Sequence, residues 1–230
     1  MDTQKYYNTF YANNILAVDN ARGEMISHCL EDIPKGKKIL DVGCGPGGQS
    51  YQLTAHNEVF GVDISTSALE IAKSRGINTY CVNLETEDLS FPDAFFDIVL
   101  ATDVLEHVFD PKSLMVKIRR VLSPKGIVIV IVPNHFSWHE RIKIIMGGGI
   151  VHSSHTLCDD WNYFHIRYFR QCSFEKFITT SGFQIEKTFH DLVLDVPRGF
   201  PLFMDRFLAR RFPDLFAAQF MAIAKKNQNE

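Results

Sequence analysis

The sequence predicts an α/β protein with a doubly wound, mostly parallel sheet. Residues 38–42 form a short apolar segment that runs into the glycines of 43–48, which is typical of a buried parallel strand ending in a tight turn. A second strand-like segment, 58–63, follows and ends in an acid. Two further strand-like segments, 183–190 and 215–224, predict an antiparallel hairpin at the end of the sheet.

Helical and extended segments are expected to alternate between these landmarks. The expected helices are 14–30, one that begins within 47–54, 66–74, 111–121, 173–180 and 201–212. The remaining expected strands are 77–82, 96–101 and 127–132, with a turn at 123–126 before the last of them. Ser65 and Ser173 are the predicted N-caps, because a hydroxyl oxygen can accept a hydrogen bond from an unsatisfied helical N–H.

The chain is expected to form a single domain over residues 1–230, since it contains no repeats and no low-complexity linker. We expect 1–33 to be an N-terminal helical lid, although its aromatic start could instead pack on the sheet edge. Segments 134–167 and 193–213 are predicted cap insertions. The first holds both tryptophans and several histidines, a mixture that suits a lid or a substrate pocket. Their spacing does not match H-E-x-x-H or C-x-x-C, so no metal site is expected there.

The glycine turn predicts a nucleoside ligand that carries a cationic group. Glycines allow a ligand to lie against bare backbone, and Asp41 could receive an ammonium group through the turn. Asp63, at the end of the second strand, is well placed to accept hydrogen bonds from ribose hydroxyls. The turn matches neither Gly-x-Gly-x-x-Gly nor a P-loop, so the ligand needs no phosphate. S-adenosylmethionine (SAM) fits this description better than a dinucleotide. Cys44, inside the turn, is read as a small residue rather than a nucleophile.

Several motifs resemble those of the class I SAM-dependent methyltransferases. The segments are ILDVGCGPGG, GVDIS, DAFFDIVLATDVLEHVFDP and VLSPKGIVIVIVPN, which lie in the family's order between Ile39 and Asn134. The resemblance implies a Rossmann-like, doubly wound, seven-stranded, mostly parallel sheet with a terminal antiparallel hairpin. It also implies SAM as cofactor, S-adenosyl-L-homocysteine as product, and methyl transfer to an oxygen or nitrogen of a small-molecule acceptor. The expected cofactor-binding residues are Asp41, Gly43, Gly45, Gly47, Asp63, Ile64, Asn83, Leu84, Thr102 and Asp103.

His107 is the candidate catalytic residue, as a general base for the acceptor. It follows the fourth strand, and the ordinary pKa of a histidine lies near physiological pH, which suits a general base. It could instead have only the structural role of ordering the loop. Asp103, Glu106 and His107 could alternatively hold a divalent ion, as some O-methyltransferases that resemble this family do. We place that below the base role, because no further oxygen ligand is visible in the sequence.

Looser segments resemble the MetW group of methionine biosynthesis. They include RGINTYCVNLE, FPDAFFD and VPNHFSWHERIKIIMGG, and with others they cover about residues 38–190. This resemblance implies an alternative function as an accessory partner of a homoserine acyltransferase. The bulky residues of 193–213, with arginines beside them, suggest a homodimer or protein-partner surface.

Composition narrows the remaining functional classes. The 230 residues are 46% hydrophobic and 22% charged, with a net charge of -3 and no early basic run, which argues against nucleic acid as a partner. No apolar run is long enough for a membrane span, and the first ten residues lack a signal-peptide core. Five cysteines without a C-x-x-C pair indicate free thiols, which predicts a cytoplasmic protein.

Overall fold

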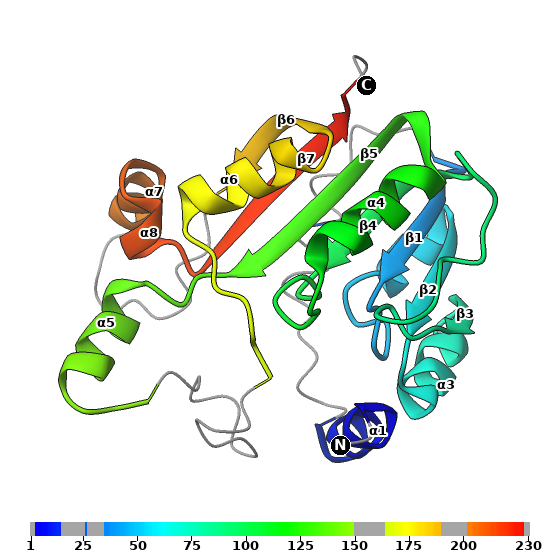
Figure 1. Ribbon diagram of the computed structural model, residues 1–230, viewed down its shortest axis with the longest axis horizontal. Helices are drawn as coiled ribbons and strands as arrows, with labels where there is room; N and C mark the ends of the chain where they lie inside the picture. Colours follow the sequence, from blue (N-terminus) through cyan, green and yellow to red (C-terminus); the bar gives the residue numbers. More distant parts are fainter. Residues whose placement is uncertain (1–2, 15–25, 27–34, 150–163, 190–201, 228–230) are drawn as a thin grey trace. The chain divides into compact units, whose positions relative to one another are not determined.

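The structure is a computed structural model that describes residues 3–14, 26, 35–149, 164–189 and 202–227. Its seven strands form one sheet in the order β3-β2-β1-β4-β5-β7-β6 (Figure 1). The strands are β1 (Lys38–Val42), β2 (Glu58–Asp63), β3 (Asn78–Cys81), β4 (Phe96–Thr102), β5 (Leu122–Pro133), β6 (Phe183–Phe189) and β7 (Gln219–Lys226). β1, β2, β3 and β4 pair in parallel, whereas β6 and β7 pair antiparallel. The predicted fold class is therefore confirmed.

The described helices other than α1, which precedes β1, lie in the connections between these strands. The helices are α1 (Thr3–Asn14), the 3-10 helix η2 (Tyr51–Ala55), α3 (Thr66–Ser74), α4 (Pro111–Val121), α5 (Trp138–Ile145), α6 (Gln171–Thr180), α7 (Leu202–Arg211) and α8 (Pro213–Phe216). The chain divides into two compact units, one of residues 1–102 and 112–129, and the other of 103–111 and 130–230. Each unit is described by itself below, and the single domain expected over 1–230 stays a prediction.

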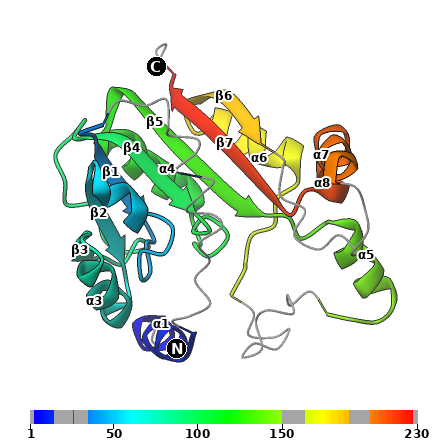
Figure 2. The same ribbon diagram turned by 180° about the vertical axis from the view of Figure 1, so that it is seen from behind.

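The first unit has its core on the parallel strands. Ile39, Leu40 and Val62 are fully buried, because side chains on both faces of an internal parallel strand are covered. In the register of β1, Asp41 lies opposite Gly61 of β2 and Leu100 of β4. α4 lies on one face of these strands (Figures 1 and 2) and buries Leu114, Met115, Ile118 and Val121 along one side. The carboxyl ends of β1, β2 and β4 consequently share one edge of the sheet.

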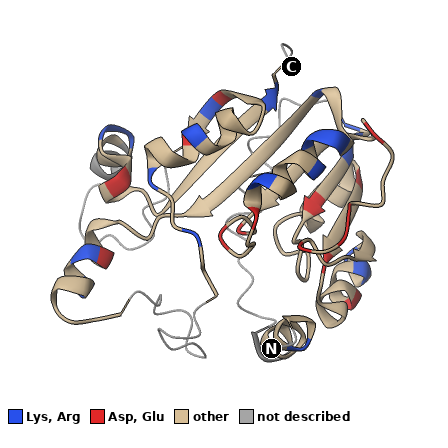
Figure 3. Ribbon diagram, viewed as in Figure 1, with Lys and Arg blue, Asp and Glu red and all other residues tan. Residues whose placement is uncertain are grey.

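Basic residues of α4, blue in Figure 3, fasten the loop that follows β3. The Nζ of Lys117 donates to the carbonyl oxygens of Leu84 (2.8 Å) and Glu87 (2.6 Å). Arg120 donates to the carboxylate of Asp93 at 2.8 Å, and this bond is the main reason that its pKa is raised. These contacts hold residues 84–93 against α4, so the carboxyl end of β3 is supported from outside the sheet.

The second unit is built on the β6–β7 hairpin and α6. The hairpin pairs Phe183 with Lys226 at one end and Phe189 with Met221 at the other, with one irregularity between Ile185 and Lys187. α6 covers one face of it (Figures 1 and 2) and buries Phe174 and Ile178. The terminal antiparallel hairpin predicted from the alternating pattern is thus present.

Four predicted elements differ in detail. The segment 47–54 holds turns and a short 3-10 helix rather than the start of an α-helix. The turn expected at 123–126 is wrong, because β5 already begins at Leu122 and extends through this stretch. The strand expected from 215 begins only at Gln219, after α8. Ser173 is the third residue of α6 rather than its cap; Arg170 is the N-cap, and its N–H donates to the Ser173 hydroxyl at 2.9 Å.

The remaining differences concern one expected helix and two observed helices that were not expected at their positions. The helix expected over 14–30 lies outside the described residues except at its first residue and at Ile26. A helix is present earlier, at α1, where the sequence showed only an aromatic cluster. α5 lies in the predicted cap insertion 134–167, where no helix was expected, and it ends before the glycines that follow Met146, as those glycines require.

Candidate functional site

The glycine turn joins the ends of β1 and β2. The N–H groups of Gly43 and Cys44 both donate to the carbonyl oxygen of Val62, at 2.8 and 3.0 Å. Gly45 has a φ of +50°, a left-handed conformation that side chains with a Cβ rarely adopt. A Cβ added at Gly45 would lie 2.7 Å from the hydroxyl oxygen of Tyr11. The backbone conformation therefore favours glycine at this position, and the end of the Tyr11 side chain occupies the space beside it.

Close packing explains a second glycine of the turn and a glycine inside β2. A Cβ at Gly47 would lie 2.4 Å from Cδ1 of Ile77, so the turn can approach this residue only without a side chain. A Cβ at Gly61 would lie 2.7 Å from the sulfur of Cys44. Burial raises the pKa of the Cys44 thiol well above its ordinary value. A buried thiol of raised pKa is a poor nucleophile, which supports the interpretation of Cys44 as a small packing residue.

Asp63 ties the glycine turn to the start of α3. Its Oδ2 accepts a hydrogen bond from the Gly45 N–H at 2.8 Å, and its Oδ1 accepts one from the Ser65 N–H at 2.8 Å. Burial raises the pKa of Asp63, while the N–H groups of Ser65, Gly45 and Ile64 oppose that rise. Ser65 caps α3 as predicted, since its hydroxyl accepts from the Ala68 N–H. The carboxylate is held in one orientation, with lone pairs beyond those two bonds.

Asp41 is the most desolvated acid of the turn. It is 1% exposed, and among the described residues no hydrogen-bond partner is found for its Oδ1. Burial raises the pKa of Asp41 to about 7, and the nearby charge of Asp63 adds to this, while the Ser50 hydroxyl acts in the opposite direction. A buried carboxylate oxygen without a partner costs free energy, which a cationic ligand group would recover.

The aromatic helix α1 lies over this turn within the first unit. Gln4 donates through Nε2 to the carbonyl oxygen of Ile64 at 3.2 Å, and the Ser65 hydroxyl donates to Oδ1 of Asn8 at 2.8 Å. The hydroxyl end of Tyr11 lies against Gly45. Burial is the main cause that raises the pKa of Tyr11, and Asp63 is the next. Tyr11 therefore lies beside the acid expected to bind the cofactor.

The remaining predicted cofactor residues follow the ends of the strands. The N–H of Val82 donates to the carbonyl oxygen of Asp63, which brings Asn83 and Leu84 to the carboxyl end of β2. Oδ1 of Asn83 accepts from the Glu85 N–H at 3.0 Å, so this side chain also shapes the loop. Thr102 is the last residue of β4 and is 4% exposed.

Asp103, which follows Thr102 in the chain, belongs to the second unit. Its φ is +51°, a left-handed conformation that Asp tolerates better than most residues. Its N–H donates to the carbonyl oxygen of Ile131 at 3.0 Å.

His107 has close polar and aromatic neighbours in the second unit. Its Nδ1 lies 3.2 Å from the carbonyl oxygen of Phe164, and its Nε2 lies 3.9 Å from Oε1 of Glu106. Its ring contacts those of Phe164 and His165, at centroid distances of 4.9 and 4.7 Å. Among the described residues, Glu106, His107 and His165 come together as a group of potential metal ligands, and Asp103 is not part of it. The expected grouping of Asp103 with Glu106 and His107 is thus replaced by one that includes His165.

Tyr11 and His165 were missed as site residues. His165 is 58 positions beyond His107, and no spacing rule connects residues so far apart. Tyr11 lies in a noticeable aromatic cluster, but nothing in that cluster indicates Gly45 as its neighbour. Only the aromatic and histidine enrichment of the two segments marked them as candidates.

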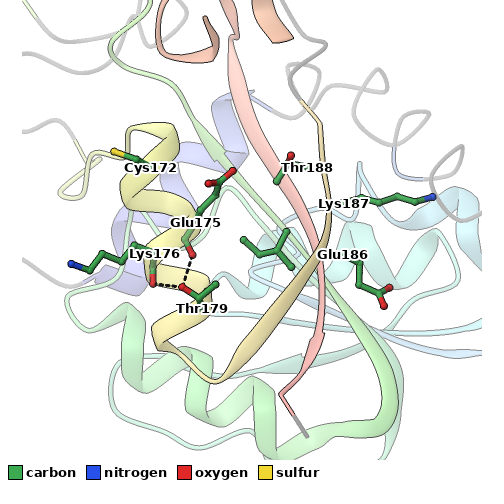
Figure 4. Close-up of a pocket in the computed structure, with 8 residues that line it drawn as sticks. Cys172, Glu175, Lys176, Thr179, Glu186, Lys187 and Thr188 are labelled. Atoms are coloured by element: carbon green, nitrogen blue, oxygen red, sulfur yellow. Dashed lines mark hydrogen bonds between the residues drawn. The ribbon is translucent and has the colours of Figure 1, made fainter. Parts of the chain in front are cut away.

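The groove between α6 and β6 offers little chemistry. Figure 4 shows its lining residues, with Lys176 directed away from Glu186 and Lys187. The lining residues are Cys172, Glu175, Lys176, Thr179, Ile185, Glu186, Lys187 and Thr188. The hydroxyl of Thr179 donates to the carbonyl oxygens of Glu175 and Lys176, both at 3.0 Å. No convergent set of polar groups is present among the residues that line this groove.

None of the described helices combines the length and apolar character that crossing a membrane requires.

The residues of the glycine turn fit SAM. The carboxylate of Asp63 can accept hydrogen bonds from the ribose hydroxyls of the cofactor. Oδ1 of Asp41, for which no partner is found among the described residues, can accept one from the methionyl ammonium. Bare backbone at Gly45 would accept the methionyl chain if the hydroxyl of Tyr11 moves or shares the space. These three features come from the structure and agree with the predicted cofactor.

The sequence similarity to known proteins lies in the part of the chain that contains the parallel strands. Residues 40–130 match the family model described as a methyltransferase domain. A ubiquinone biosynthesis O-methyltransferase from Idiomarina loihiensis is 38% identical over 98 residues, which are 40% of this chain and 40% of that protein. Phosphoethanolamine N-methyltransferase 3 of Arabidopsis thaliana is 31% identical over 105 residues, which are 43% of this chain and 21% of that protein. The match spans less than half the length of these relatives.

Solved structures resemble the chain over nearly its full length. A magnesium protoporphyrin IX methyltransferase from Synechocystis, solved with S-adenosylhomocysteine bound, has a TM-score of 0.67 at 15% identity and covers 97% of each chain. A SAM-dependent methyltransferase from Thermotoga maritima has a TM-score of 0.65 at 18% identity, again over 97% of each chain. At such identities the likeness concerns the fold alone. The chain therefore has the fold of the class I, SAM-dependent methyltransferases, and its residues 40–130 match the methyltransferase-domain model.

Proposed function

We propose that the protein transfers the methyl group of SAM to an oxygen or nitrogen atom of a small-molecule acceptor. The observation that carries this proposal is the buried pair of acids, Asp41 and Asp63, at the carboxyl ends of β1 and β2 beside bare glycine backbone. When bound, SAM supplies an electrophilic methyl group on a positively charged sulfur. The protein then has to orient the acceptor and exclude water, because in-line displacement needs little covalent help.

His107 is proposed as the group that receives the acceptor's proton. Because the Phe164 carbonyl can only accept, Nδ1 of His107 carries the hydrogen of that bond, and Nε2 of the neutral ring keeps a lone pair. Bound SAM would give its methyl group to the acceptor oxygen or nitrogen and would keep the electron pair of the broken carbon–sulfur bond. Nε2 of His107 would take the acceptor's proton.

The likeness to relatives narrows the acceptors worth testing. The two named relatives are an O-methyltransferase of ubiquinone biosynthesis and a phosphoethanolamine N-methyltransferase. We therefore propose phenolic hydroxyls and small primary amines as the first two acceptor classes. The MetW-like accessory role, as a partner of a homoserine acyltransferase, has no observation in its favour among these similarities.

Further parts of the proposal concern α1, α7 and location. Tyr11 against Gly45 supports a role of the N-terminal segment as a lid on the cofactor site. On α7, Phe207 is 66% exposed and Arg210 and Arg211 are exposed, which supports a surface for a second copy or a protein partner within 193–213. A cytoplasmic location is supported by the cysteine pattern, and Cys44, Cys81 and Cys172 are free thiols.

Binding and turnover should be measured on the same purified protein. Calorimetry with S-adenosyl-L-homocysteine tests the cofactor site, and transfer of a labelled methyl group to catechols and to phosphoethanolamine tests the two acceptor classes. Saturable binding together with turnover of either class supports the proposal. Absence of binding would overturn it at the cofactor, while binding without any transfer would favour a non-catalytic protein.

A further inference from the structure

We infer that Arg75 is a positioning residue that holds the glycine turn in the conformation that binds the methionyl end of SAM. Arg75 is the C-cap of α3, and its side chain is half-buried. Its Nη1 donates to the carbonyl oxygen of Pro46 at 2.9 Å. Pro46 directly follows Gly45, whose bare backbone is the proposed contact of the methionyl chain. The inference therefore rests on the proposed placement of SAM at this turn.

The same guanidinium also lies over the ring of Tyr51. Its Cζ is 5.4 Å from the ring centroid, within the range of a cation–π contact. The N–H of Tyr51 in turn donates to the carbonyl oxygen of Gly47 at 3.0 Å. Arg75 thus contacts the turn directly through Pro46 and a second time through the first residue of η2. A planar guanidinium can donate a hydrogen bond and stack on a ring at once, which a lysine ammonium cannot do equally well.

These contacts fix the peptide group that joins Pro46 to Gly47. In a trans peptide the C=O and the N–H point in opposite directions. The C=O of this group accepts from Arg75, and its N–H donates to the carbonyl oxygen of Cys44 at 2.9 Å. Gly47 has a φ of +75°, in a region that glycine enters and leaves at little cost. The turn therefore depends on contacts from outside it to keep one conformation.

The position of Arg75 is itself set by α3. Its N–H donates to the carbonyl oxygen of Ala72 at 3.0 Å. Ala72 is fully buried, and its Cβ lies 3.3 Å from the place that a Cβ at Gly47 would take. At its other end α3 is capped by Ser65, whose N–H donates to the carboxylate of Asp63. One helix therefore connects the acid expected to bind the ribose with the turn expected to bind the methionyl chain.

Arg75 acts through the backbone of the turn rather than through its charge. The main causes that shift the pKa of Asp41 are burial, the Ser50 hydroxyl and the charge of Asp63, and Arg75 is not among them. Without Arg75 the turn would have to be ordered when the ligand binds, and this ordering cost would appear as a lower affinity. The loss should affect ligands that contact the turn and spare those that contact only the ribose acid.

Two ligands test this inference by calorimetry on the full chain. S-adenosyl-L-homocysteine has the amino-acid end, whereas 5′-methylthioadenosine keeps the adenosine and the sulfur but lacks the amino and carboxylate groups. Arg75→Met should weaken binding of the first at least about tenfold, the lower end for loss of a charged hydrogen bond, and of the second less than about twofold. Arg75→Lys, which can keep the bond to Pro46 but loses the stacking, should recover part of the loss. Lys73→Met, an exposed residue of the same helix end, should bind both ligands as the parent does.

Amide hydrogen exchange of the ligand-free proteins separates positioning from folding. Arg75→Met should speed exchange within residues 43–52 and leave β1 and β2 unchanged, whereas a general loss of stability would speed exchange in all of them. Equal loss of affinity for both ligands, or no loss for either, would overturn the inference. If Arg75→Met fails to fold, Arg75→Lys decides by the same comparison of the two ligands.

The same experiment keeps this inference apart from the proposed function. A parent protein that binds S-adenosyl-L-homocysteine but transfers no methyl group would refute the proposed transfer and leave the role of Arg75 standing. A parent that binds neither ligand would overturn the placement of SAM and this inference together.

Discussion

Replacing the buried carboxyl of Asp41 with an amide should stabilise the protein at alkaline pH. The pKa of Asp41 is raised from 3.8 to about 7, so the folded state binds a proton that the unfolded state releases above pH 4. Stability must therefore fall as pH rises between about 4 and 7, because here the folded state holds more protons. At about 1.4 kcal/mol per pKa unit, the full cost of ionising this group in the folded state is about 4 kcal/mol.

The Asp41→Asn variant removes this cost and nearly keeps the shape of the side chain. Its gain in unfolding free energy over the parent should be about 2.5 kcal/mol larger at pH 8 than at pH 5, from the same two pKa values. Urea unfolding of both proteins at the two pH values measures this difference. Glu58→Gln, at an exposed carboxyl at the start of β2, is the matched control and should show no such change. A gain independent of pH would refute the reasoning, because the buried carboxyl would then not titrate in this range.

Four further results are expected. SAM affinity of the parent should fall about tenfold from pH 8 to pH 6, as Asp41 becomes protonated, and Asp41→Asn should lose this dependence in calorimetry. Asp63→Asn should weaken SAM binding by about 1–3 kcal/mol, and unchanged affinity would contradict its ribose role. Tyr11→Ala should speed SAM dissociation in stopped-flow measurements if α1 is a lid; an unchanged rate would argue for simple packing. Phe207→Ser should change the unfolding free energy by less than about 0.5 kcal/mol because the ring is exposed, while lowering self-association or partner binding; outright unfolding would show that it belongs to the core.

The sequence alone determined the cofactor half of the protein. Strand, glycine turn and acid are local features, and parallel strands must end at the same edge of a sheet. The relation of Asp41, Gly45 and Asp63 therefore follows from short-range patterns. The helix at 111–121 and the hairpin at the end of the chain were likewise readable from periodicity and from Pro and Gly signals. The start of β5 was misjudged because Pro and Gly usually mark a turn, and here Pro124 is exposed and Gly126 buried within a continuous strand.

Tertiary structure decided the contacts between distant segments. His165 beside His107 and Tyr11 against Gly45 both depend on how loops and helices pack, and packing is not encoded in any fixed spacing. The same holds for the pKa of Asp41, since a carboxyl with ordinary neighbours in sequence becomes hard to ionise only when the fold removes it from water. Local pattern specifies the backbone path and its turns, whereas burial and long-range contacts determine the chemistry of the side chains on it.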